Sequence, residues 1–517
     1  MRTDLSNLDG RGFDVVVIGG GINGASSAQH LAASGYAVLL VDKGDFASGS
    51  SGRSTRLLHC GLRYFETPNP VRDFLFDPSR FRTALGMAKA SMETRAELAT
   101  DSADRLMPFT LCFPIYKNGP YKPWHLDMGF RILGALGPKS VPLDYQRIPG
   151  PEARGLPLVD ALADPEQLLS VVTFREYIYD WPERFCIDAV LDAERMGATV
   201  RNYTAARLVE RDALGLWHVG LTDADGAASV TAPVVLNMAG IWIDQVNRTE
   251  APGPKPRRLI LGTKGAHIVV RLPPAYRDYG IAAVNSIGEP HYCLPSQGGC
   301  HHIGPTETVY EGDIEDIRVN RSELDFLLTE TRNVLPGLAL DEADVVYSWA
   351  GVRPLTFDPA FPKGNRSREL HDLTKQGLPN VLAMTAGPIM SHRSAGRQIT
   401  TAVKRLILPS GATQRPDYRP RSLPDDANAL PLIEGDDSVR ISHLGHVAET
   451  EHARELGDIL FARTGLGYRH RLGDADIQRA AEAVAAHFSW DAAEIDRQVG
   501  TVKNRMKTLY QPAPNAD

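Results

Sequence analysis

A glycine-rich turn between a short apolar run and a helical pattern constrains the fold of this chain more than any other feature. The apolar run Val15–Ile18 leads into Gly-Gly-Gly-Ile-Asn-Gly-Ala at positions 19–25, and a helical pattern continues through Leu31. A second apolar run, at 38–41, ends on Asp42. This order of strand, glycine turn, helix and strand is the βαβ pattern that binds dinucleotides.

The residue types in this turn have physical reasons. Gly19 permits the tight turn out of the strand, Gly21 lets the backbone approach a pyrophosphate, and Gly24 lets the helix pack closely on the strand. The helix N-terminus, which includes Asn23, offers N–H groups and a partial positive charge to phosphates. Asp42 can accept hydrogen bonds from a ribose diol. We therefore expect these five residues to bind the cofactor.

Length, charge and cysteine content limit the classes of protein to which this chain can belong. A chain of 517 residues exceeds one hydrophobic core, so we expect two or three domains. The formal charge of -7 argues against nucleic acid as the main partner. The five cysteines have no C-x-x-C spacing, which suits a reducing compartment. No cluster of residues has metal-ligand spacing, so no metal is expected.

The sequence shows no apolar signal segment and no run of 18 apolar residues. It therefore predicts a cytoplasmic protein, with peripheral contact to the inner face of the cell membrane left open.

The glycine turn alone does not separate a flavin from a nicotinamide cofactor. A nicotinamide-binding domain is usually one continuous block, whereas the strand patterns here recur at 13–42, 199–240 and 345–405. We therefore expect one sheet built from three pieces of the chain, with a substrate domain between the pieces. That discontinuity favours FAD.

Five ordered motifs carry a resemblance to a known family. They read DVVVIGGGINGA, GRSTRLLHCGLRYFE, LGTKGAHIVV, HHIGPTETVYEGD and YSWAGVRPL. Together they closely resemble the flavin-dependent glycerol-3-phosphate dehydrogenases, within the wider group of D-amino-acid-oxidase-like flavoproteins. The resemblance is strong over 13–405 and weaker over 440–510, where LGDADIQRAAEAVAAHFSWD looks like the helical tail of that family.

The resemblance implies an α/β fold with three parts. These are an FAD-binding domain of the glutathione-reductase type, an inserted antiparallel substrate domain and a C-terminal helical domain. The expected ranges are 1–100, 166–250 and 345–408 for the FAD-binding domain, 101–165 for a cap and candidate membrane-contact segment, 251–344 for the substrate domain, 409–431 for a linker and 432–517 for the helical domain.

The resemblance also implies a reaction. A secondary alcohol of a polyol phosphate, by default sn-glycerol 3-phosphate, becomes a ketone, here dihydroxyacetone phosphate. Hydride passes to the flavin N5, and the electrons pass to a quinone or another acceptor. The protein must then bind and orient the substrate and move one proton. The helical domain could support a homodimer or an interaction with a respiratory partner, and the sequence does not decide between these.

Two residues are expected to act in catalysis by the same resemblance. His267 matches the histidine near the substrate, and an imidazole can take the hydroxyl proton because its pKa lies near the operating pH. Arg353 matches the arginine beside the flavin, where a guanidinium would bind the developing alkoxide.

Further residues are expected to bind substrate or cofactor. Arg63 and Tyr64 look like the substrate pair of the family, with Arg63 facing a phosphate or carboxylate. His392 and Arg393 follow the late glycine and are expected to contact substrate. The remaining residues expected at the cofactor are Ser54, Thr55, His59, Gly240 and Gly387.

The sequence departs from the family pattern at two substrate positions. The family lysine that helps to hold phosphate is Pro388 here, and the family tyrosine is His392. Proline offers neither a charge nor an N–H donor. Losing one cation from a closed phosphate pocket costs about 2–3 kcal/mol when nothing compensates.

Several alternatives therefore stay open. The substrate could be another polyol phosphate such as an erythritol phosphate, an unphosphorylated polyol, or a 2-hydroxy or amino acid held by Arg63 or Arg353. A non-catalytic flavin-binding protein is the alternative of another class, although it would need none of Arg63, His267 and Arg353.

An aromatic-rich segment at 104–140 has two interpretations. Its aromatic residues are interleaved with Lys117, Lys122, His125 and Arg131, a mixture found at lipid headgroups. The segment shows no clean amphipathic period, so an ordinary aromatic strand and helix packed on the domain is the other interpretation.

Overall fold

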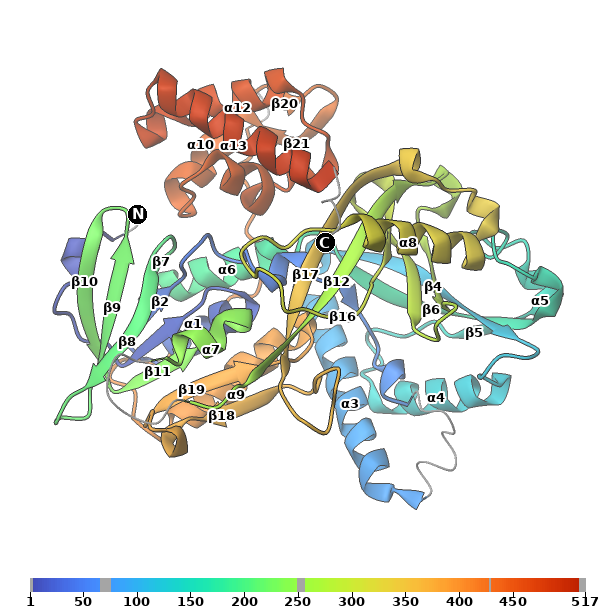
Figure 1. The fold of residues 1–517 in the computed structure, drawn as a ribbon, viewed down its shortest axis with the longest axis horizontal. Coiled ribbons are helices and arrows are strands. Elements are labelled where there is room, and N and C mark those ends of the chain that lie inside the picture. Colours follow the sequence, from blue (N-terminus) through green and yellow to red (C-terminus); the bar gives the residue numbers. More distant parts are fainter. Residues whose placement is uncertain (1–2, 66–75, 249–255, 427–428, 511–517) are drawn as a thin grey trace.

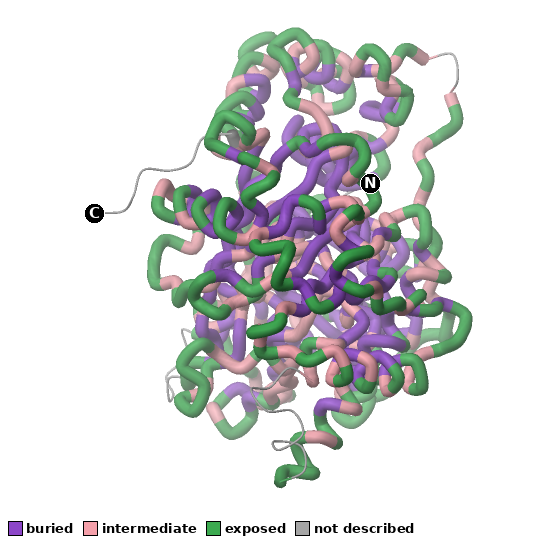
Figure 2. Tube along the Cα trace, turned by 90° about the vertical axis from the view of Figure 1, so that its right-hand side faces the viewer, coloured by how far each residue is buried: buried purple, intermediate pink, exposed green. Residues whose placement is uncertain are grey.

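Two large β-sheets lie beside each other, and a domain of helices packs at one end of both, shown in orange and red (Figure 1). The computed structural model describes residues 3–65, 76–248, 256–426 and 429–510. Buried segments run through the centre of the chain trace, and exposed segments surround them (Figure 2).

The first sheet has six strands in the order β18-β19-β11-β1-β2-β7. Five of them are parallel, and β18 pairs antiparallel with β19 at one edge. The strands come from the three pieces that the sequence predicted, which confirms the discontinuous domain. Their bounds are β1 Val15–Ile18, β2 Val38–Val41, β7 Thr199–Arg201, β11 Val234–Asn237, β18 Glu369–Asp372 and β19 Val381–Thr385.

Both faces of this sheet are buried. Val15 and Val17 of β1 pack in the core that includes helices α1 (Ile22–Ala33) and α6 (Pro182–Arg195). Val16 and Ile18, which alternate with them, pack in the core on the other face. A three-stranded antiparallel sheet covers that second face, formed by β8 (Ala205–Arg211), β9 (Trp217–Asp223) and β10 (Gly226–Ala232). Helix α9 (His392–Val403) packs against α1.

The second sheet has ten strands and is mostly antiparallel. Its main path runs β16-β12-β15-β14-β13-β4-β6-β3, with β17 paired to β12 and β5 paired to β6. The bounds are β3 Leu57–Leu58, β4 Leu106–Tyr116, β5 Gln146–Pro149, β6 Leu168–Tyr179, β12 Ile260–Arg271, β13 Tyr279–Val284, β14 Pro290–Ser296, β15 Cys300–Gly304, β16 Thr308–Val309 and β17 Val345–Thr356. This is the antiparallel substrate domain that was expected.

The second sheet draws strands from beyond the range 251–344 expected for the substrate domain. Strand β4 lies within 101–165, β6 within 166–250 and β17 within 345–408, yet all three belong to this sheet. Each of these ranges therefore differs from the expected division. The physical reason is that an inserted antiparallel sheet is completed by strands on both sides of the insertion, and local patterning does not reveal which sheet a strand joins.

The aromatic-rich segment mostly packs inside this second domain. Strand β4 pairs with β6 along its whole length, and Phe109, Phe113 and Phe130 are buried. Helix α4 (Pro123–Leu136) buries Phe130 but leaves Trp124 and Met128 about half exposed.

Shorter helices and the long α3 complete the two domains. They are α3 Pro78–Asp101, α5 Gly150–Ala153, α7 Ile243–Val246 and α8 Arg321–Val334. In the described part of the chain, no helix has both the length and the apolar character needed to cross a bilayer.

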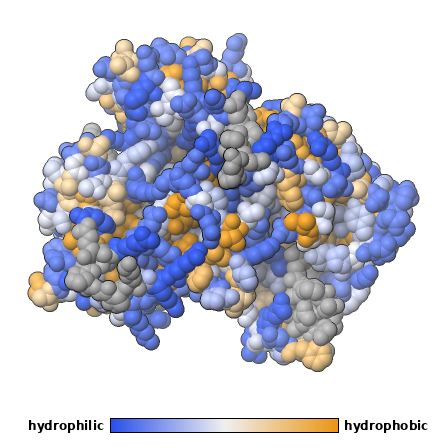
Figure 3. All heavy atoms as spheres, viewed as in Figure 1, coloured by the Kyte–Doolittle hydropathy of each residue, from blue (hydrophilic) through white to orange (hydrophobic). Residues whose placement is uncertain are grey.

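The C-terminal domain has its own hydrophobic core, which includes Leu444, Phe461 and Val484. Its elements are β20 Pro431–Ile433, β21 Asp436–Arg440, α10 Ile441–Thr450, the π-helix η13 Asp458–Arg463, α11 Leu466–Arg469, α12 Asp474–Phe488 and α13 Ala492–Tyr510. In the view of Figure 3, hydrophilic residues cover much of this domain, and hydrophobic residues show near the centre of the face below it.

Candidate active site and cofactor cavity

A large cavity lies between the two sheets. Its volume is about 1130 Å³, and its lining residues come from both sheets and from the loops that follow β1, β2, β11 and β19. Ligands of open α/β sheets bind at the carboxyl ends of the parallel strands, which is where these loops are. A cavity of this size and position can hold a dinucleotide together with a small substrate.

The glycine turn forms one end of the cavity. Gly19, with φ of 107°, and Gly21 line it together with Asn23. Gly24 does not line the cavity, and its role is packing, because a Cβ there would clash with the carbonyl of Gly19. A Cβ on Gly19 would lie 2.6 Å from the carbonyl oxygen of Met238. The chain therefore passes too close to itself here for any side chain, and α1 presents its N-terminus to the cavity.

Asp42 closes this end of the cavity through backbone contacts. Its Oδ2 accepts from the N–H of Gly20 at 2.6 Å, and its Oδ1 accepts from the N–H of Gly44 at 2.9 Å. Burial raises the pKa of Asp42 to about 6, against the lowering effect of these two hydrogen bonds. The carboxylate therefore holds the glycine turn against the loop after β2, besides lining the cavity where a ribose diol was expected.

Serine and threonine side chains line the middle of the cavity. Ser54 and Thr55 line it as expected. Ser51 also lines it, and its Oγ accepts from the N–H of Ile22 at the start of α1 at 2.9 Å. Gly240 and Gly387, both at positive φ, line it after β11 and β19. This arrangement places backbone and hydroxyl groups along the length of the cavity.

The register of β12 and β17 places the two expected catalytic residues on one wall. His267 lies opposite Trp349, and Thr263 lies opposite Arg353. Gly265 and His267 are two residues apart and share a face of β12, while Trp349 and Arg353 share a face of β17. Both His267 and Arg353 line the cavity.

Two direct contacts hold the ring of His267. Its ring stacks on Trp349 with centroids 4.8 Å apart, and its Nε2 lies 3.1 Å from Oγ1 of Thr55. The Nε2–H of His302 donates to the carbonyl of Thr55 at 3.1 Å. Burial lowers the pKa of His267 well below its ordinary value, and the neighbouring His302 and Arg353 lower it further. The imidazole is therefore neutral at physiological pH and can accept a proton.

The guanidinium of Arg353 lies against Gly265 of β12. A Cβ on Gly265 would lie 2.8 Å from Cζ of Arg353, so only glycine leaves room for the guanidinium at this point. Nη1 of Arg353 is buried and has no hydrogen-bond partner within the described ranges. Burial lowers the pKa of Arg353 to about 10, and the charges of Arg366 and Arg63 add to this effect. A guanidinium with one buried, unpartnered nitrogen at the wall of a cavity fits an anionic ligand.

Arg63, Tyr64 and His59 line the cavity from the segment after β3. Arg63 is exposed, and the ring of Tyr64 lies edge-on to His59 with centroids 5.8 Å apart. Burial lowers the pKa of His59 to about 3, followed by the effect of the Arg63 charge. The segment therefore presents one cation and one neutral imidazole to the cavity.

The structure keeps two expected substrate residues out of this cavity. His392 begins α9 with its ring near that of Phe185, and Nη1 of Arg393 lies 2.9 Å from Oδ2 of Asp101. Neither residue lines the cavity. The reason is local: after Gly387 the chain enters α9, and the first turn of this helix faces α3 and α6. The expectation for His392 and Arg393 is corrected accordingly.

Several charged residues that line the cavity were not anticipated from the sequence, among them Arg366, Glu307 and Glu289. Arg366 and Glu307 both line it and form an ion pair, and Glu289 lines it while pairing with Lys363 at 2.6 Å. The N–H of Gly387 donates to the carbonyl of Arg366 at 3.3 Å, which brings Arg366 beside the Gly387–Pro388 turn. These residues lie in irregular loops with no periodic pattern, so only the run Lys-Gly-Asn-Arg at 363–366 offered a signal.

Known proteins match this chain over most of its length. A family model described as FAD dependent oxidoreductase matches residues 14–397. A glycerol-3-phosphate dehydrogenase from Synechocystis sp. is 29% identical, covering 77% of this chain and 71% of that protein. Glycerol-3-phosphate dehydrogenase 2 from Mycobacterium tuberculosis is 27% identical, covering 97% of this chain and 90% of that protein.

A solved structure matches the whole fold. The glycerol-3-phosphate dehydrogenase from Bacillus halodurans, complexed with FAD, has a TM-score of 0.72 and 20% identity. The match covers 99% of this chain and 98% of that one, including the C-terminal domain. The resemblance drawn from the sequence motifs is thereby confirmed, and FAD fits a cavity with a glycine turn, a helix N-terminus and a buried carboxylate at one end. The chain belongs to the FAD-dependent oxidoreductase family, as a divergent member.

Proposed function

We propose that this chain oxidises the secondary alcohol of a polyol phosphate to a ketone, with glycerol 3-phosphate as the default substrate. The observation that carries the proposal is the set of guanidinium groups near a neutral imidazole: Arg63, Arg353 and Arg366 line the same cavity as His267. A phosphate carries two negative charges and several acceptor oxygens, which suits more than one arginine. The names of the relatives given above agree with this substrate class.

Arg366 supports a phosphate site despite the absence of the family lysine. Its backbone accepts from Gly387, the residue before Pro388, and its guanidinium pairs with Glu307 at the cavity. Arg366 therefore brings a cation from a neighbouring loop to the cavity that Pro388 also lines without a charge. The additional cation favours a phosphate-bearing substrate over an unphosphorylated polyol.

In this proposal the protein accepts the hydroxyl proton of the substrate and stabilises the negative charge that develops on the oxygen. When bound, FAD supplies the acceptor for the hydride. His267, neutral and fixed between Thr55 and Trp349, takes the hydroxyl proton on its unprotonated ring nitrogen. Arg353 lies on the same wall and stabilises the oxygen as its negative charge develops.

The second candidate is oxidation of a 2-hydroxy or amino acid. The buried, unpartnered Nη1 of Arg353 favours it, because a single guanidinium binds a carboxylate well. The presence of Arg63 and Arg366 in the same cavity favours the phosphate, and so ranks this candidate second.

A quinone is the proposed electron acceptor, and a peripheral membrane contact goes with it. The half-exposed Trp124 and Met128 on α4 support such a contact, because large side chains of this kind insert at the lipid headgroup boundary. Flotation with anionic vesicles tests it. We expect the wild-type protein to float and the double variant Trp124→Ser with Met128→Ser to stay at the bottom. Wild-type protein that stays at the bottom would exclude this contact.

Anaerobic reduction of the flavin tests the proposed function. Glycerol 3-phosphate, erythritol phosphates, unphosphorylated polyols and 2-hydroxy or amino acids are added in turn to the purified holoprotein while the flavin absorbance is followed. We expect phosphorylated polyols to bleach the flavin, with glycerol 3-phosphate the fastest. Bleaching by acids alone would select the second candidate, and bleaching by none would favour a non-catalytic flavin-binding protein.

A further inference from the structure

The loop after β2, residues 42–51, has two different sides. One side lines the cavity through Asp42, Gly44 and Ser51. The other side carries Asp45 and Phe46, which are buried but do not line the cavity. This segment is called the nucleotide loop below.

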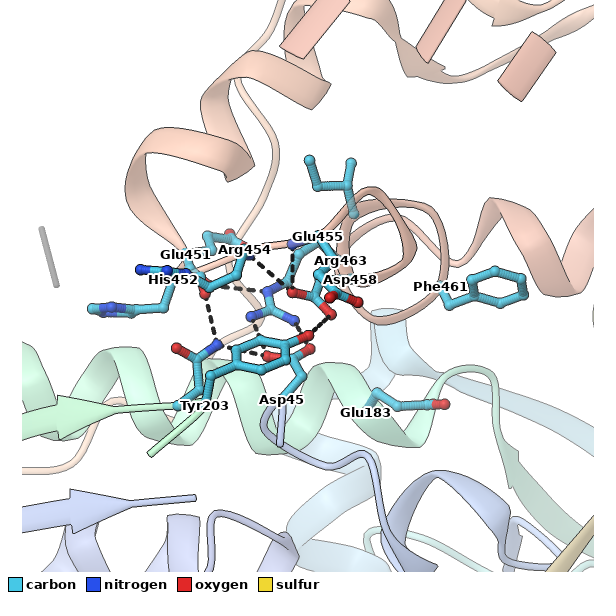
Figure 4. A network of polar contacts seen from close by, with 12 residues as sticks. Asp45, Glu183, Tyr203, Glu451, His452, Arg454, Glu455, Asp458, Phe461 and Arg463 are labelled. Atoms are coloured by element: carbon cyan, nitrogen blue, oxygen red, sulfur yellow. Dashed lines mark hydrogen bonds and ion pairs between the residues drawn. The ribbon is translucent and has the colours of Figure 1, made fainter. Parts of the chain in front are cut away.

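The C-terminal domain contacts the side of the nucleotide loop that carries Asp45 and Phe46. Arg463, at the end of η13, donates from Nη1 to Oδ2 of Asp45 at 2.5 Å and from Nη2 to Oδ1 at 2.9 Å (Figure 4). The side chain of Arg463 has no exposed surface. Its Nε donates to the carbonyl of Glu451 at 3.0 Å, so its position is fixed from within its own domain. The ring of His452 also lies edge-on to that of Phe46, with centroids 6.3 Å apart.

A second set of hydrogen bonds holds the nucleotide loop, and it comes from the residues that follow β7. The side-chain amide of Asn202 donates to Oδ1 of Asp45 at 2.9 Å and to the carbonyl of His452 at 2.7 Å. The N–H of Tyr203 donates to the carbonyl of Gly44, and the Tyr203 hydroxyl donates to Asp458 at 2.7 Å. Tyr203 and Asp458 face each other beside the Arg463–Asp45 pair in Figure 4.

Hydrogen bonds and packing also hold the nucleotide loop against the glycine-rich turn after β1. Asp42 accepts from the N–H of Gly20, and the N–H of Ala47 donates to the carbonyl of Gly20 at 3.2 Å. The ring of Phe46 lies so close to Gly20 that a Cβ there would clash with it. A displacement of Asp45 or Phe46 would therefore move the backbone that approaches the pyrophosphate.

Within the described ranges, the C-terminal domain does not reach the cofactor cavity, since the lining residues all lie between Ile18 and Ile389. Any effect of the domain on FAD must therefore pass through residues such as Asp45. A buried ion pair adds little net stability, but removing one partner leaves an uncompensated buried charge, so such pairs fix geometry more than they add stability.

We propose that the C-terminal domain positions the nucleotide loop for FAD through the Arg463–Asp45 pair, so that domain docking and FAD binding strengthen each other. Arg463 and Asp45 are positioning residues, because neither touches the cavity. Linkage requires the effect to be reciprocal: FAD must also stabilise the docked domain. The proposal rests on FAD binding alone and not on the identity of the substrate.

The chain offers a matched control at the same domain boundary. Arg184 of α6 binds Glu451 through Nη1 at 2.6 Å and Nη2 at 2.8 Å, and both side chains are buried. This pair also joins the C-terminal domain to the first domain, but it does not contact the nucleotide loop. Glu451→Gln therefore weakens docking in general, whereas Asp45→Asn and Arg463→Met disturb the loop.

The first measurement is FAD affinity, by titrating flavin-free protein with FAD and following the quenching of flavin fluorescence. We expect Asp45→Asn and Arg463→Met to raise the Kd by about tenfold or more, and Glu451→Gln to raise it by less than about twofold. Circular dichroism checks that each variant is folded, and Asp45→Asn, which keeps the side-chain shape, carries the test should Arg463→Met not fold. An equal change in Kd for all three variants would show general loss of docking and overturn the proposal.

The second measurement tests reciprocity in the wild-type protein and in two of the variants. Limited proteolysis of the linker at 409–431 follows release of the C-terminal domain, with and without FAD. We expect FAD to slow cleavage in the wild type and in Glu451→Gln, and to have a smaller effect in Asp45→Asn. Equal cleavage of wild-type protein with and without FAD would overturn the proposal, whatever the substrate of the enzyme is.

Discussion

Nε2 of His267 lies 3.1 Å from Oγ1 of Thr55, although 212 residues separate them along the chain. Thr55 follows the nucleotide loop, whereas His267 lies on β12 of the second sheet. The contact therefore joins the cofactor side of the cavity to its substrate side. For the base that we propose His267 to be, such a contact fixes the orientation of the ring, which is a large part of what a protein contributes to proton transfer.

Replacing His267 tests whether it is the base. We expect His267→Gln to lower the rate of flavin reduction by about 100-fold or more, because the amide cannot accept the proton. FAD content should stay the same, since the phosphate end of the cavity is untouched. Stopped-flow absorbance under anaerobic conditions measures the rate. Reduction at close to the wild-type rate would place the base elsewhere.

The pH dependence of the same step follows from the lowered pKa of His267. Burial favours the neutral imidazole, so the proton-accepting form stays fully populated until the pH falls through the lowered pKa. We therefore expect the rate of flavin reduction at saturating substrate to be flat from about pH 6 to 8 and to fall only at more acidic pH. An acidic limb centred near the ordinary histidine pKa would contradict the neutral, buried imidazole.

The parts of the site that could be predicted from the sequence follow local rules. The glycine turn and Asp42 were predicted because a tight turn next to a buried strand restricts which residues can occur there. His267 and Arg353 stood in motifs on long strands, and the pairing of those strands brings them to one wall. The three-piece sheet was predicted because continuous apolar runs mark buried parallel strands.

What the sequence did not reveal depends on tertiary geometry. Arg393 was expected at the substrate, but the first turn of α9 directs its guanidinium to Asp101 and over the ring of Tyr418 at 3.9 Å. Arg366 was not anticipated, because its loop has no period and its position depends on a hydrogen bond to Gly387. The Arg463–Asp45 pair joins residues 418 positions apart, and no local pattern encodes such a contact.

Arg366 is expected to bind the substrate phosphate. Removing its charge should weaken binding of a phosphorylated polyol by about 10- to 100-fold, the loss typical of one charge-assisted contact. Binding of an unphosphorylated analogue should change little in Arg366→Met. Substrate titrations of flavin reduction give both values. An equal loss for the two ligands would indicate a structural role for the ion pair with Glu307.

Arg393 is expected to contribute to stability and not to substrate binding. Its guanidinium joins α9 to Asp101 and to the hydroxyl of Ser102 at the C-terminal end of α3. Arg393→Met should lower the free energy of unfolding by about 1 kcal/mol, because the buried Ser102 hydroxyl loses its donor while the partly exposed Asp101 carboxylate is screened by solvent. The KM of the folded enzyme should stay within about twofold of wild type. Thermal unfolding and steady-state kinetics on the same preparation separate the two effects.

Gly265 is expected to control the position of Arg353. A methyl group on Gly265 would lie 2.8 Å from Cζ of the guanidinium, and β12 is too well paired with β17 to move away. Gly265→Ala should therefore displace Arg353 and lower the rate of flavin reduction about tenfold or more, because charge stabilisation depends on placement. Gly86→Ala on α3 is the control, since nothing lies within 4 Å of a Cβ there. That control should be neutral or slightly stabilising, as expected for alanine in a helix. Unchanged reduction in Gly265→Ala would mean that the guanidinium has another position from which it can act.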